Sequence, residues 1–146
     1  MRIIGLMCLL LACAPRSVDV LMNPTNTPGE FSYSGVGTLT SPMPGYHETC
    51  RLAGIEGLCR VSLRFTEGWS AESITIAKSS GNRWLDDSSR AAAAGVMLEP
   101  SACARLRTPV HADFDYRFTL NWAANPIPDS GREGLVEIER VRLWTE

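Results

Sequence analysis

The sequence lacks the motifs that mark common catalytic sites. It contains no G-x-S-x-G nucleophile motif, no H-E-x-x-H zinc motif and no glycine-rich phosphate loop. It has two histidines and five cysteines, and these do not fall into the spacing of a metal-binding set. An enzyme is therefore the least supported class of protein, and we expect no cofactor.

The sequence also lacks an excess of basic residues. The 146 residues carry a formal net charge of -2, which gives no basic face for nucleic acid. A hydrophobic content of 45% and a charged content of 21% are ordinary for a globular protein of one domain.

No apolar run is long enough to span a bilayer, which takes about 20 residues. The apolar run Ile3–Ala12 instead follows a positive Arg2 and matches the core of a signal peptide, so residues 1–12 are predicted to be a signal peptide. The segment Leu10–Cys13 resembles a lipobox, in which the cysteine is lipidated and becomes the new N-terminus. The alternatives are an ordinary secretory signal with Cys13 incidental, or a short uncleaved anchor.

Lipidation at Cys13 would place the chain on the periplasmic face of a bacterial envelope. Ala14 follows the cysteine, and this favours the outer membrane. Five of the nine prolines lie between Pro15 and Pro44, so residues 13–43 are predicted to be a tether rich in Pro, Ser and Thr. Alternation over Tyr33 to Leu39 leaves room for one short strand there.

A domain is predicted over residues 44–121. Its strands are indicated by two-residue alternation and its helices by capping glycines and an alanine-rich centre. The predicted order is helix 44–53, strand 58–65, strand 73–78, helix 86–96 and strand 110–120. This order predicts an α+β fold, with a small antiparallel sheet of three to four strands and two helices packed on one face.

Residues 122–146 are predicted to form a loop and an extra strand. Val136, Ile138, Val141 and Leu143 fit a strand that has a bulge between Ile138 and Val141. If this extra strand pairs with the strand predicted at residues 110–120, it occupies the edge of the 110–120 strand.

A tyrosine, small residues and glycines precede the first predicted strand at fixed spacing and lead into its alternating positions. These residues are Tyr46, Cys50, Gly54, Gly57, Cys59, Val61 and Phe65. A second stretch begins at Ser79-Ser80-Gly81, before the second predicted helix. Together they resemble the C-terminal domain of the TonB family (TonB/TolA-like), and the resemblance covers roughly residues 42–120. His47 stands where the family has proline.

The resemblance implies a mode of binding in which a partner's extended segment pairs with the last strand of the domain, residues 110–120. The residues expected at such a partner site are Tyr46, His111, Asp113, Asp115 and Arg117. Simple solvation of these charged side chains is one alternative. A metal site formed by His111, Asp113 and Asp115 is another.

The family pattern also places Cys50 and Cys59 on inner faces, which makes a disulfide between them a candidate. The alternative is that both are small buried apolar residues. Cys103 could compete as a partner.

The expected function is that of a non-enzymatic envelope lipoprotein. Its domain would bind an extended segment of an envelope or outer-membrane transport partner by strand addition. The alternative is a structural lipoprotein subunit of an envelope or secretion assembly.

Overall fold

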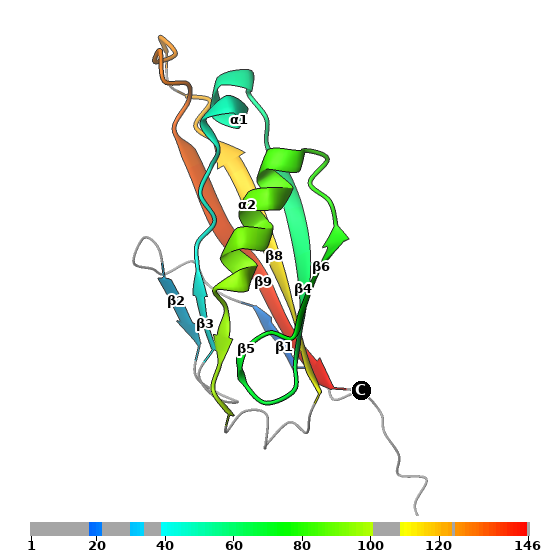
Figure 1. Ribbon diagram of the computed structural model, residues 1–146. Helices are drawn as coiled ribbons and strands as arrows, with labels where there is room; N and C mark the ends of the chain where they lie inside the picture. The colour runs from blue at the N-terminus through cyan, green and yellow to red at the C-terminus, as the bar shows by residue number, and fades with distance from the viewer. Residues whose placement is uncertain (1–17, 22–29, 34–38, 101–108, 124, 146) are drawn as a thin grey trace, which may run out of the picture.

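The computed structural model describes residues 18–21, 30–33, 39–100, 109–123 and 125–145. Within these ranges two antiparallel sheets and two helices form the protein (Figure 1). The sequence-based expectation of an α+β fold is confirmed.

The larger sheet has five strands, and the neighbours are antiparallel throughout. In spatial order they are β1 (Val18–Leu21), β9 (Gly134–Thr145), β8 (Val110–Leu120), β4 (Gly57–Phe65) and β6 (Ser73–Lys78). The outer strands of this sheet are therefore β1 and β6.

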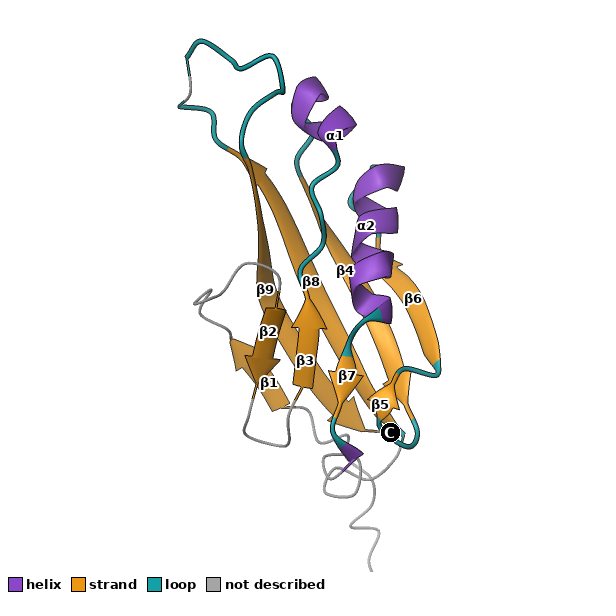
Figure 2. Ribbon diagram, turned by 60° about the vertical axis from the view of Figure 1, so that its left-hand side comes forward, coloured by secondary structure: helices purple, strands orange, loops and turns teal. Residues whose placement is uncertain are grey.

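The smaller sheet has four short strands. Their spatial order is β2 (Glu30–Tyr33), β3 (Leu39–Pro42), β7 (Met97–Leu98) and β5 (Trp69–Ser70). Both α1 and α2 lie on the same side of the five-stranded sheet as this smaller sheet (Figure 2).

Each helix begins at a side-chain cap that satisfies free backbone donors. In α1 (Glu48–Ala53) the His47 ring accepts from the amide of Thr49, and in α2 (Arg83–Ala94) the Asn82 side chain caps the first turn. Gly54 ends α1 with φ at 71°, a left-handed conformation that glycine adopts without strain.

The core lies between the five-stranded sheet and the layer of helices and short strands. Alternation correctly predicts the buried side of both central strands. The fully or almost fully buried residues are Cys59, Val61, Leu63 and Phe65 of β4 and Val110, Ala112, Phe114, Tyr116, Phe118 and Leu120 of β8. On the opposite side the sheet is open.

The expected tether is partly wrong, because three paired strands lie within residues 13–43. Leu39 is fully buried and pairs in register with Leu98. Ser41 is buried, and its hydroxyl lies 3.3 Å from the hydroxyl of Tyr116 on the five-stranded sheet. Residues 39–42 therefore belong to the folded body.

The predicted C-terminal strand and its bulge are confirmed. Asp115 pairs with Arg140 and Tyr116 with Ile138, so Glu139 is the extra residue on β9. β9 pairs along the whole of β8 and is the fourth strand of the sheet, within the expected three to four. The fifth strand is β1, which comes from the expected tether and pairs with β9.

Candidate strand-docking edge

The predicted docking strand β8 is not an edge strand. It pairs with β4 over residues 110–118 on one side and with β9 over residues 110–120 on the other. Its backbone groups are therefore engaged within the sheet, and the expectation that a partner pairs with residues 110–120 is wrong for this fold. In the sequence, the inner position of β8 is indicated only by the extra strand predicted after residue 122.

The charged side chains of β8 lie on the open side of the sheet and form local pairs. The guanidinium of Arg60 donates to both carboxylate oxygens of Asp115, at 2.7 and 2.9 Å. These hydrogen bonds and the charge of Asp115 raise the pKa of Arg60. The hydroxyl of Ser62 donates to Asp113 at 2.6 Å. Asp115 is only 5% exposed, so little of its side chain is accessible to a partner.

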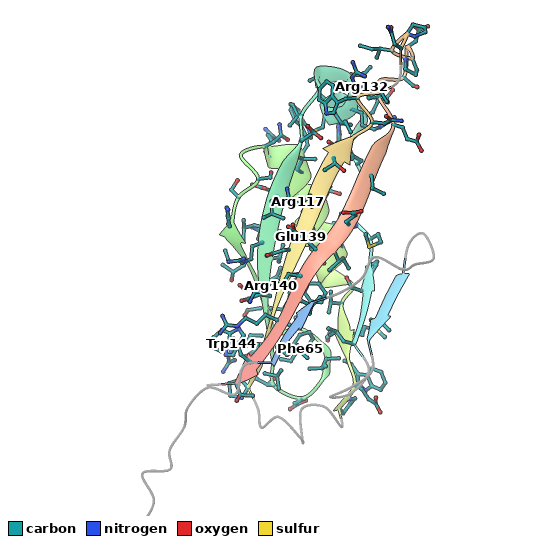
Figure 3. All side chains as sticks on the ribbon, turned by 180° about the vertical axis from the view of Figure 1, so that it is seen from behind. Phe65, Arg117, Arg132, Glu139, Arg140 and Trp144 are labelled. Atoms are coloured by element: carbon teal, nitrogen blue, oxygen red, sulfur yellow. The ribbon has the colours of Figure 1, made fainter. Side chains whose placement is uncertain are left out.

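Further pairs join β8 to β9 on the same side. The guanidinium of Arg117 donates to Glu139 at 2.9 and 3.0 Å, and these bonds raise the pKa of Arg117. The ring of His111 stacks on Trp144 with their centroids 4.0 Å apart. Figure 3 shows Arg117 beside Glu139, with Trp144 farther along β9.

The metal alternative has no support in these contacts. The described residues contain no group of three or more His, Cys, Asp and Glu side chains that could hold a metal ion. Asp113 and Asp115 instead accept hydrogen bonds from Ser62 and Arg60. A depression of about 30 Å³ lies beside them, room for about two water molecules.

Tyr46 lies on the other side of the sheet. Its ring meets Phe118 edge to face at 5.4 Å, and its hydroxyl donates to the carbonyl of Ile55 at 2.5 Å. Burial, followed by the charge of Glu56, raises the pKa of Tyr46 to about 12. A β-carbon on Gly134 would lie 2.4 Å from this ring, so the start of β9 requires glycine. The structure therefore does not bring Tyr46 together with the four residues of β8.

The proposed disulfide is not formed, because Cys50 and Cys59 are both buried free thiols. The thiol of Cys50 donates to the side-chain oxygen of Asn82 at 3.4 Å. Burial raises the pKa of the Cys50 thiol and raises that of Cys59 to about 11. The alternative that both are small buried residues fits this arrangement. Cys103 and Cys13 lie outside the described residues.

The two edges of the large sheet differ in how they are protected. β6 is six residues long, carries Lys78 and faces a register shift at Arg60 and Val61 of β4. An edge lysine is a common protection against strand addition, and residues 134–139 of β9 contain none.

The other edge is only partly covered. β1 pairs with the four residues Arg140–Leu143 of β9. No strand in the described part of the chain pairs with the outer side of residues 134–139, which we call the open half of β9. Its side chains include Leu135, which is 55% exposed, and the partly buried Val136. Figures 1 and 2 show this half beyond the end of β1.

Sequence reasoning did not identify the open half of β9 as a candidate site. What the sequence did indicate is that a C-terminal strand paired with β8 would cover the edge of β8. Glu137 and Glu139 lie in β9 just before Arg140 and Arg142, and this change of charge is visible in the sequence.

Comparison with protein-family models, with curated proteins and with solved structures found no match to this chain. The resemblance to the TonB family therefore stays an expectation. No helix of the described ranges is long and apolar enough to cross a membrane.

Proposed function

We propose that this protein is a non-enzymatic binding module that captures an extended segment of an envelope partner by strand addition to the open half of β9. The observation that carries the proposal is the pairing of β9 among the residues that the structure describes: β9 has 12 residues and meets β1 over four of them. An unpaired edge offers backbone donors and acceptors to an incoming strand.

The side chains beside this edge suit an incoming strand. Val136 and Ile138 point toward the core, so an apolar residue beside them would extend the buried layer. Leu135 on the open side offers an apolar contact that is otherwise exposed. Backbone pairing and these alternate contacts together would supply affinity and specificity.

The proposal includes a lipid anchor at Cys13, as the lipobox-like segment predicts. Val18, where β1 begins, is five residues after Cys13. Because an extended chain covers at most about 3.5 Å per residue, β1 would then lie within roughly 18 Å of the membrane surface. The proposed partner is therefore an envelope protein present at the same membrane surface.

Site-specific photocrosslinking in the intact cell tests the proposal. A photoreactive residue at position 135, on the open half of β9, is compared with one at position 75, on the outer strand β6. Leu135 and Thr75 are both exposed, so the two positions are matched in access. We expect a discrete adduct from position 135 and none from position 75. Adducts from position 75 alone, or from neither position, would refute the proposal.

A further inference from the structure

The open half of β9 is acidic, whereas the covered half is basic. Glu137 and Glu139 belong to the open half, and Arg140 and Arg142 belong to the half that pairs with β1. In that ladder the acidic Asp19 stands opposite Arg142. The strand of this chain that already pairs with β9 thus places an acidic residue against the basic half.

Only one cation on β8 serves the carboxylates of the open half. Arg117 stands opposite Glu137 in the ladder, and its guanidinium hydrogen-bonds Glu139. Two carboxylates therefore share one guanidinium, and Glu133 precedes the strand as a third acidic group.

Two other cations lie near the open half. Arg140 follows Glu139 and stands opposite Asp115 in the ladder, and Arg132 lies against the loop before β9. The guanidinium of Arg132 stacks on the Trp122 ring at 4.5 Å and lies 3.3 Å from the Trp122 carbonyl. Residues 133–139 themselves carry three carboxylates, those of Glu133, Glu137 and Glu139, and no basic side chain.

From this distribution of charge we infer that the open half of β9 selects an extended segment that alternates apolar and basic residues. The inference rests on the proposed strand addition and names the chemical class of the partner. In the bound segment, every second residue would lie beside Val136 and Ile138 on the core side. The residues between them would lie beside Glu137 and Glu139 on the open side, where opposite charges on neighbouring strands attract.

A pair of designed peptides tests the inference with the full chain. Both are fluorescein-labelled eight-residue peptides, one alternating valine with lysine and the other valine with glutamate. We expect the lysine peptide to bind about ten-fold more tightly, because two cross-strand pairs change from attraction to repulsion. We also expect its affinity to fall as salt is raised.

Variants of the protein separate local recognition from general attraction. Glu137→Lys should reduce or reverse the preference, whereas Asp87→Lys, on the exposed surface of α2, should leave it unchanged. Amide hydrogen exchange should show protection of residues 134–139 when the lysine peptide binds. Circular dichroism of each variant checks that the fold is retained.

Two failures have different meanings. Protection of residues 134–139 with equal affinity for the two peptides would overturn the charge preference and leave strand addition standing. No protection of these residues by either peptide would overturn the proposed function as well. An equal loss of preference in Glu137→Lys and Asp87→Lys would show that net charge, rather than this edge, attracts the peptide.

Discussion

Leu39 gives a direct test of whether the strands before residue 44 are part of the folded body. Its side chain is fully buried, and β3, which contains it, pairs with both β2 and β7. Leu39→Ala removes three carbon atoms, which lowers the free energy of unfolding by about 2.4 kcal/mol at about 0.8 kcal/mol per buried carbon. The remaining cavity raises the expected loss to about 3 kcal/mol.

The matched control is Leu52→Ala in α1, because Leu52 is 56% exposed. This variant should lose less than about 0.5 kcal/mol. Urea unfolding followed by tryptophan fluorescence and by circular dichroism measures both variants, and Leu39→Ala should also melt about 10 °C lower. A loss for Leu39→Ala no larger than that for Leu52→Ala would refute the packing of β3 and restore a tether up to residue 43.

Three further predictions concern the open side, the start of β9 and the buried thiol. Asp115→Ala should lower the free energy of unfolding by about 1–2 kcal/mol in urea titration, because the bidentate pair with Arg60 is lost while Arg60 stays partly hydrated. An unchanged urea midpoint would contradict a stabilising pair between Asp115 and Arg60. Gly134→Ala should cost about 1–3 kcal/mol by thermal unfolding, because the added carbon meets the Tyr46 ring; a neutral result would deny that contact. Burial raises the pKa of Cys59 from 9.0 to about 11, so the stabilising contribution of the protonated thiol is complete below pH 9 and is lost as the pH rises toward 11. The decline in the free energy of unfolding between pH 9 and 11 should therefore be shallower in Cys59→Ala. Parallel curves for the two proteins would contradict this.

The sequence was sufficient to predict the elements whose pattern is local. Two-residue alternation identified β4 and β8 and the side of each that is buried, since side chains of a strand alternate between its faces. The bulge in β9 was visible in the spacing of Ile138 and Val141.

The missed elements depend on contacts between distant residues. β3 is only four residues long and includes Ser and Pro, so it has no clear local signature of a strand. It is ordered through residues far along the chain, as in the contact between Ser41 and Tyr116, which are 75 positions apart. For the same reason the sequence could not establish that β8 lies inside the sheet, because its position depends on pairing with β9.

The central claim is that the open half of β9 receives a partner strand. The measurement that tests it most directly is amide hydrogen exchange of the full chain with a synthetic peptide of the segment that crosslinks to position 135. We predict slower exchange at alternate amides of residues 134–139, because every second amide of an edge strand faces outward, with no change in β6 (Ser73–Lys78). Unchanged exchange in residues 134–139, or protection confined to β6 or the helices, would contradict the claim.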